Sequence, residues 1–139
     1  MRRSRGRALL LLGACLVLAA AQCPTESARR IANGAWGGEH IGMLVTDTGA
    51  TIEYDCAAGV ISQPLRLNAG GDFEWMGIHY IGQGGPIRVD QPPNAHPARY
   101  TGRATTASMT LTLTLTDGAQ PPQTFTLTRG GNAHVFKCL

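Results

Sequence analysis

The stretch that most restricts the fold of this chain is SMTLTLTLTD, residues 108–117. Met109 and three leucines occupy every second position, and threonines fill the positions between them. A period of two puts the apolar set on one face, which predicts a half-buried antiparallel strand with its threonines in water. QTFTLT, residues 123–128, repeats the scheme with Phe125 and Leu127 facing inward, and the prolines of the intervening GAQPPQ predict a turn. We therefore expect a β-hairpin.

The same alternation extends through most of the chain and predicts an all-β fold. Ile41, Met43 and Val45 share one face, as do Ile52, Tyr54 and Cys56, with a hairpin turn between them. Further strands are expected at residues 59–67, 71–81, 85–89, 99–105 and 133–138, with a long surface loop over 89–99. No window has helical periodicity, and 18 glycines and 8 prolines interrupt every candidate helix. We predict an antiparallel, lipocalin-like β-barrel of six to nine strands with little or no helix.

The N-terminal segment predicts export. MRRSRGR is basic, residues 8–21 are almost wholly apolar, and Ala19 to Ala21 supply an A-x-A cleavage pattern, which together are typical of a secretory signal peptide. We expect a signal peptide over 1–21, a flexible lead-in over 22–33 and one barrel domain over 34–139. The protein would then be periplasmic or extracellular. LGAC, ending at Cys15, also resembles a bacterial lipobox, and lipidation there would anchor the protein to the cell envelope.

Cleavage changes the charge of the chain. The full chain has 12 basic and 9 acidic residues, but Arg2, Arg3, Arg5 and Arg7 leave with the signal peptide. The mature chain is then close to neutral and slightly acidic. Such a balance lacks the basic footprint of a nucleic-acid-binding protein.

Three cysteines remain after cleavage, and export would place them where disulfides persist. Cys23 lies in the polar lead-in CPTESARR, so Cys56 and Cys138 are the expected pair. Cys56 is in phase with Tyr54 and Cys138 is in phase with Phe136, so the two sulfur atoms would meet on the buried side of the strands. The role of Cys23 stays open.

Asp47-Thr48-Gly49-Ala50 reads D-T-G-A and resembles the catalytic signature of retropepsin-like aspartic proteases. That resemblance implies a catalytic carboxylate at Asp47, paired with a second one across a two-fold axis. The later apolar-apolar-Gly strand of those enzymes is missing from this sequence, and Thr46 stands where an apolar residue is usual. We therefore favour a hairpin tip in which Asp47 hydrogen-bonds its own turn and Gly49 is left-handed.

Two further resemblances concern the fold. Gly34-Ala35-Trp36 resembles the G-x-W signature of lipocalins, in which the tryptophan plugs the closed end of a barrel. WGGEHIGMLVTDTGATIEYDCAAGVISQPL, PARYTGR and MTLTLTLTD together resemble a group of uncharacterised bacterial exported proteins. That group implies one β-domain with Cys56 and Cys138 and carries no assigned activity.

The aromatic residues give the only expected ligand site. Trp36 and the stretch GDFEWMGIHYIG suggest a pocket lining or contact surface made of Trp36, Phe73, Trp75 and Tyr80. The four histidines form no metal-binding spacing, so a zinc or acid/base site would need assembly across strands. We expect no metal and no cofactor.

We thus predict a monomeric, non-enzymatic binding protein. Its partner would be a small apolar molecule in the barrel or a protein at the barrel's rim. The alternative is a secreted protease inhibitor that inserts CPTESARR or DQPPNAHP into an active site, and a protease using Asp47 is the third hypothesis.

Overall fold

A computed structural model describes residues 29–82, 84–85 and 88–138. The described residues form ten strands and no helix. The strands are β1 (Arg29–Arg30), β2 (Gly34–Gly38), β3 (Ile41–Val45), β4 (Ala50–Tyr54), β5 (Ala57–Ile61), β6 (Arg66–Leu67), β7 (Asp72–Ile81), β8 (Ala95–Ala104), β9 (Ser108–Leu115) and β10 (Gln123–Arg129).

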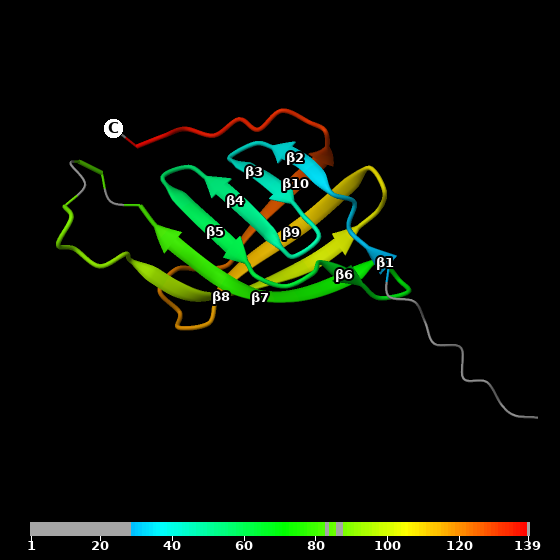
Figure 1. Cartoon of the computed structure of the whole chain (residues 1–139), viewed down its shortest axis with the longest axis horizontal. Helices are drawn as coiled ribbons and strands as arrows, with labels where there is room; N and C mark the ends of the chain where they lie inside the picture. The colour runs from blue at the N-terminus through cyan, green and yellow to red at the C-terminus, as the bar shows by residue number, and fades with distance from the viewer. Residues whose placement is uncertain (1–28, 83, 86–87, 139) are drawn as a thin grey trace, which may run out of the picture.

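Eight of these strands close into an antiparallel barrel, which confirms the predicted fold class (Figure 1). The order around the barrel is β10-β2-β3-β4-β5-β7-β8-β9, so nearly every strand lies beside its neighbour in sequence. β10 and β9 pair over six residues, from Gln123↔Leu113 to Thr128↔Ser108. β10 and β2 pair over only two, Thr128↔Gly37 and Arg129↔Trp36. The barrel therefore closes at one short seam, and the first half of β10 pairs with β9 only.

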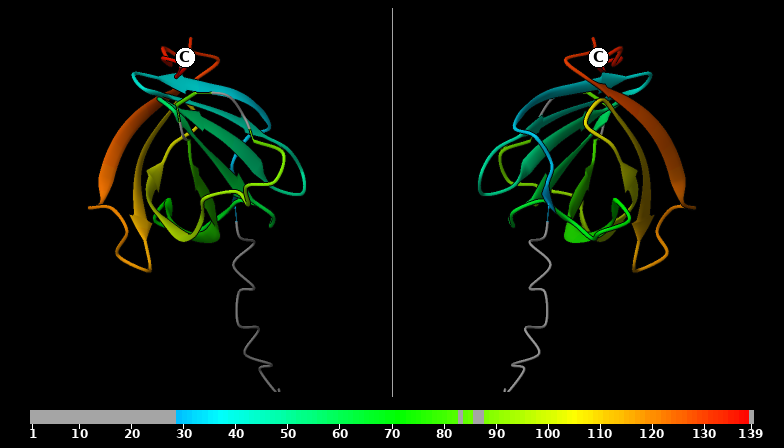
Figure 2. Two further views of the ribbon diagram at one scale, coloured as in Figure 1. Left: turned by 90° about the vertical axis from the view of Figure 1, so that its left-hand side faces the viewer. Right: turned by 90° about the vertical axis from the view of Figure 1, so that its right-hand side faces the viewer.

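One end of the barrel is closed by the chain that leads into it. β1 pairs with β6 in a separate two-stranded sheet, and the Ile31 N–H donates to the Leu65 carbonyl at 2.9 Å (Figure 2, right). Ile31, Leu65 and Leu67, in or next to this sheet, are buried. Below them Phe73 stacks on Trp75, with ring centroids 3.8 Å apart, and the Trp75 indole N–H donates to the Arg66 carbonyl. We call this the closed end.

The centre of the barrel is occupied by side chains that alternate along the strands as expected. Trp36, Ile52, Tyr100, Leu111 and Leu127 are almost completely buried there. The Trp36 indole N–H donates to the carbonyl of Ala32, so its one polar atom is satisfied inside the core. The threonines of β9 and β10 point outward, and Thr112 and Thr124 hydrogen-bond across the strands at 2.9 Å.

After β10 the chain runs back over the outside of the barrel to the opposite end, which we call the mouth (Figure 1). Residues 130–138, the C-terminal tail, cross the β2–β3 pair where Gly37 lies opposite Gly42. A Cβ atom at Gly42 would lie 2.7 Å from the Cβ of Ala133, and one at Gly37 would collide with the backbone of Gly131. This bare glycine pair is therefore what lets the tail lie flat against the barrel.

The packing of the tail against Gly42 can be tested by substitution. Gly42→Ala should push the tail outward and lower the free energy of unfolding by about 1–3 kcal/mol, because the added methyl overlaps Ala133. The double variant Gly42→Ala, Ala133→Gly should recover most of the loss, which a double-mutant cycle by chemical denaturation would measure. Equal losses in the single and double variants would show that Ala133 does not lie over Gly42.

Several local predictions were wrong. Residues 133–138 are not a strand: they form one isolated parallel bridge, Glu39↔His134. β8 begins at Ala95 rather than 99, so the expected loop over 89–99 is shorter at its C-terminal end. Pro97 is tolerated in β8 because it lies just beyond the last β8–β9 pair, Ala98↔Leu115. Its carbonyl accepts from the Thr116 N–H, and its missing N–H leaves the β8–β9 ladder uninterrupted.

The lead-in and the D-T-G-A turn also differ from expectation. Residues 29–33, placed in a flexible lead-in by the sequence, contain β1 and the buried Ile31, whereas residues 22–28 lie outside the described part. The hairpin is confirmed, and the Thr46 N–H donates to the Gly49 carbonyl. Gly49 is not left-handed: a Cβ there would overlap the carbonyl oxygen of Ile61, so glycine serves a close backbone approach.

Candidate functional site

A hollow lined by aromatic and ionisable side chains lies at the mouth of the barrel, the end that faces the viewer in Figure 2, left. This mouth cavity has a volume of about 480 Å³, within the range of small-molecule sites. Its lining comes from the ends of β4, β5, β7 and β10 and from the turns beside them. The residues are His40, Tyr54, Asp55, Cys56, Ala57, His79, Ile81, Gly82, Gln120, Gln123 and Phe125.

Aromatic rings form the inner wall of the mouth cavity. The ring of Tyr54 lies 5.2 Å from that of Phe125 and 5.1 Å from that of His79, edge to face with the latter. Tyr54 and His79 are buried, and within the described part of the chain Tyr54 Oη and His79 Nδ1 have no hydrogen-bond partner. Burial raises the pKa of the Tyr54 hydroxyl and, together with nearby His96, lowers the pKa of His79, so both side chains are neutral at neutral pH.

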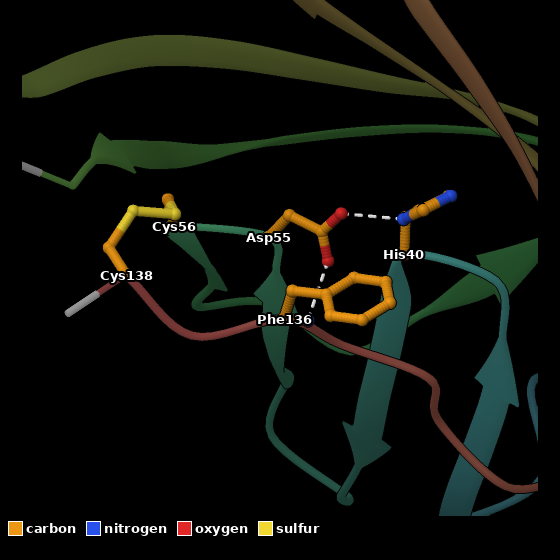
Figure 3. Close-up of a disulfide and its surroundings, with 5 residues drawn as sticks. All are labelled: His40, Asp55, Cys56, Phe136 and Cys138. Carbon is orange, nitrogen blue, oxygen red and sulfur yellow. Dashed lines mark hydrogen bonds and ion pairs between the residues drawn. A yellow bond between two sulfur atoms is a disulfide. The ribbon is translucent and has the colours of Figure 1, made fainter.

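Asp55 organises the rim of the cavity (Figure 3). One carboxylate oxygen accepts from His40 Nδ1 at 2.5 Å, and the other accepts from the backbone N–H of Phe136 at 2.8 Å. The Phe136 hydrogen bond, and after it His40, hold the pKa of Asp55 below its usual value. Asp55 thus joins the β2–β3 turn, the β4–β5 turn and the C-terminal tail at one point.

The disulfide completes the same junction. Cys56 and Cys138 are bonded, as predicted, but at the rim rather than on the buried side of the strands. Cys56 lies in the two-residue turn between β4 and β5, and Cys138 lies in the exposed tail. Phe136, expected to face the core, is exposed and lies against His40 with ring centroids 5.9 Å apart. The tail packs on the rim because the barrel interior is already filled.

Left-handed backbone conformations also occur at the rim of the mouth cavity. Of the non-glycine residues that the structure describes, His40 and Cys56 are the two with positive φ, at 64° and 55°. Both line the mouth cavity and both lie next to Asp55 in space or in sequence. Residues held in the left-handed region cluster at functional sites, because the surrounding structure must enforce a conformation that costs energy.

The lowered pKa of Asp55 gives a pH dependence for the tail. Because the folded-state pKa is below the unfolded one, the stabilisation is present above the ordinary carboxyl pKa of 3.8 and is lost as the pH falls through the lower folded value. Hydrogen exchange should therefore show the Phe136 amide protected near neutral pH and losing protection in acid. In Asp55→Asn that transition should disappear, and an unchanged transition would exclude Asp55 as its cause.

Two other histidine–carboxylate pairs exist in the described structure. His134 Nδ1 lies 2.5 Å from Glu39 and fixes the tail to the β2–β3 turn. His96 Nδ1 lies 2.7 Å from Asp117, and its other ring nitrogen bonds Asn94. These pairs arise by assembly across strands, which no spacing in the sequence could reveal. The described residues contain no group of three or more His, Cys, Asp or Glu side chains placed to hold a metal ion.

The residues expected to bind a ligand lie elsewhere. Trp36, Phe73 and Trp75 are buried in the core or at the closed end, and none of them lines the mouth cavity. Tyr80 has the opposite parity from His79 and lies on the outer face of β7 beside the exposed Ile78. The ligand role of these four residues stays a prediction. The mouth cavity instead gathers Tyr54 and Phe125, which the sequence placed among inward-facing core residues.

Asp47 is at the exposed tip of the β3–β4 hairpin, away from the mouth. Its carboxylate accepts from the Asn33 side chain at 2.9 Å, and its backbone carbonyl accepts from Arg30 at 2.5 Å. The expectation that Asp47 hydrogen-bonds its own turn was wrong. The hydrogen bonds of this residue hold the segment before β2 against the hairpin.

Comparison with protein-family models, with curated proteins and with solved structures gave no match for this chain. The resemblances to lipocalins and to bacterial exported proteins therefore stay predictions. None of the described residues belongs to a helix that could cross a membrane. The disulfide is compatible with an oxidising compartment outside the cytoplasm.

Proposed function

We propose that this protein is an exported, non-enzymatic binding protein that holds a small, mostly apolar ligand in the mouth cavity. The observation that carries the proposal is the cavity itself, about 480 Å³ with walls of Tyr54, Phe125 and Ile81. Because side chains occupy the centre of the barrel, we assign the ligand to the mouth cavity rather than to the barrel interior. Apolar walls with a few polar groups are what small-molecule sites have in common.

The local structure supports a built site. A two-residue turn with a left-handed second residue, an aspartate with both oxygens engaged and a disulfide all converge on one rim. Each of these fixes groups that would otherwise move, and a site that is rigid before binding loses less entropy when the ligand arrives.

Gln123→Trp tests the proposal. Gln123 lines the mouth cavity from the exposed start of β10, so an indole there should fill the opening and weaken binding of an aromatic probe at least tenfold. Thr124→Trp is the matched control, because Thr124 is the next residue of β10 and faces the outside of the barrel. The probe is 2-naphthol, titrated by isothermal calorimetry. Equal affinities in both variants and the parent, or no binding to the parent, would overturn the proposed function.

A further inference from the structure

The rim of the mouth cavity carries one hydrogen-bond acceptor whose direction is fixed, the second ring nitrogen of His40. His40 Nδ1 lies 2.5 Å from Asp55 Oδ2. An ionised carboxylate can only accept, so Nδ1 carries a proton, and in a neutral imidazole with that tautomer Nε2 keeps a free lone pair. Figure 3 shows this nitrogen pointing away from Asp55, and His40 lines the cavity.

The acceptor is held in place from three sides. Asp55, which orients the ring, is itself fixed by the Phe136 N–H. The ring of Phe136 lies beside the imidazole, and the backbone of His40 is locked in a left-handed turn. A carboxylate behind an imidazole sets both its tautomer and its orientation, so the other nitrogen meets a ligand without reorganising.

The charges around the cavity limit what can bind there. Among the described residues that line it there is no lysine or arginine, and its one carboxylate is already engaged by His40 and Phe136. An anionic ligand would meet no lysine or arginine there and would lie close to Asp55. A cationic ligand would have to compete with two existing hydrogen bonds to the same carboxylate. Burying either charge without a partner is unfavourable.

Resting on the proposed binding function, we propose that the ligand is an uncharged molecule with a flat aromatic or similarly apolar ring that carries a hydroxyl or N–H donor. The ring packs against Tyr54 and Phe125, and the donor hydrogen-bonds His40 Nε2. The amide side chains of Gln120 and Gln123, which bond each other at the rim, cover the solvent side of the ring. His40 is then the residue that sets specificity.

Three probes of one shape test this assignment at neutral pH by isothermal calorimetry. They are 2-naphthol, 2-methylnaphthalene, in which a methyl replaces the hydroxyl, and 2-naphthoate, which is an anion. We expect 2-naphthol to bind about tenfold more tightly than 2-methylnaphthalene, because the latter covers His40 Nε2 without giving it a hydrogen-bond partner. We expect 2-naphthoate to bind more weakly than 2-naphthol.

His40→Asn separates the hydrogen bond from general packing. Asparagine tolerates the left-handed backbone, so the turn is retained while Nε2 is lost. In this variant the preference for 2-naphthol over 2-methylnaphthalene should fall to near one. His134→Asn is the matched control, since His134 is paired with Glu39 at the same distance but does not line the cavity. It should keep the tenfold preference.

The outcomes distinguish the two levels of the proposal. Equal binding of 2-naphthol and 2-methylnaphthalene to the parent, tighter binding of 2-naphthoate, or an unchanged preference in His40→Asn would overturn the ligand class and leave the mouth site standing. Failure of both neutral probes to bind the parent would overturn the mouth site as well.

Discussion

Trp36→Ala is expected to lower the free energy of unfolding by about 3–5 kcal/mol, the usual cost of removing a large buried aromatic side chain. Trp36 is 1% exposed and is among the largest fully buried side chains of the barrel. It also donates its indole N–H to Ala32, which fixes the chain entering β2. Both the core and the closing strand pair β10–β2 would therefore be weakened, and urea denaturation followed by circular dichroism measures the loss.

Met76→Ala is the control for Trp36. Met76 lies on the outer face of β7 and is 51% exposed, so its truncation should change the free energy of unfolding by less than about 0.5 kcal/mol. Trp36→Phe should fall between the two, because it keeps most of the apolar volume but loses the hydrogen bond to Ala32. A cost below about 1 kcal/mol for Trp36→Ala would contradict the placement of this residue in the core.

Loss of the disulfide should also lower the free energy of unfolding, because the unfolded chain gains conformational entropy when the cross-link is removed. Cys56 and Cys138 are 82 residues apart, and a covalent loop of that length removes chain entropy worth about 4 kcal/mol in the loop-closure model. Cys138→Ser is a better variant than a substitution of Cys56, because Cys56 has a left-handed backbone that its substitution would also disturb. Scanning calorimetry should show a lower melting temperature for Cys138→Ser than for the oxidised parent.

Reduction of the parent with dithiothreitol provides an independent check on the disulfide. The reduced parent and Cys138→Ser should melt together, whereas Cys23→Ser should melt with the oxidised parent. If reduction lowered the melting temperature of Cys138→Ser as well, a different disulfide would be stabilising the fold.

The barrel was predictable because its signal is local and repeated. Alternation such as that of Met109, Leu111 and Leu113 determines which face of a strand is buried, and repeated segments of this kind favour closure into a barrel. β2 (Gly34–Gly38), which completes the barrel, lacks this alternation and was not predicted as a strand. The C-terminal tail was not predictable in this way. His134, Phe136 and Cys138 alternate like a strand, yet the barrel was already complete, so the tail packs outside it against Gly37 and Gly42.

The mouth cavity depends on long-range geometry that the sequence pattern does not carry. Tyr54, His79 and Phe125 each face inward, and the parity of their strands predicted this for Tyr54 and Phe125. That they line a cavity rather than fill the core follows from their position at strand ends that all lie at the mouth. Phe73 and Trp75 belong to the same face of β7 as His79 but lie at the other end, where β1 and β6 cover them. Strand ends are the least certain part of any prediction from sequence.

An NMR titration with 2-naphthol tests the central claim most directly, because it reports where on the barrel the probe binds. We expect the shifted backbone amides to gather at the mouth, on His40, Tyr54, His79, Ile81 and Phe125, and those of Phe73 and Trp75 at the closed end not to shift. Shifts centred on the closed end or on the outer face of β7, or no shifts anywhere, would contradict it.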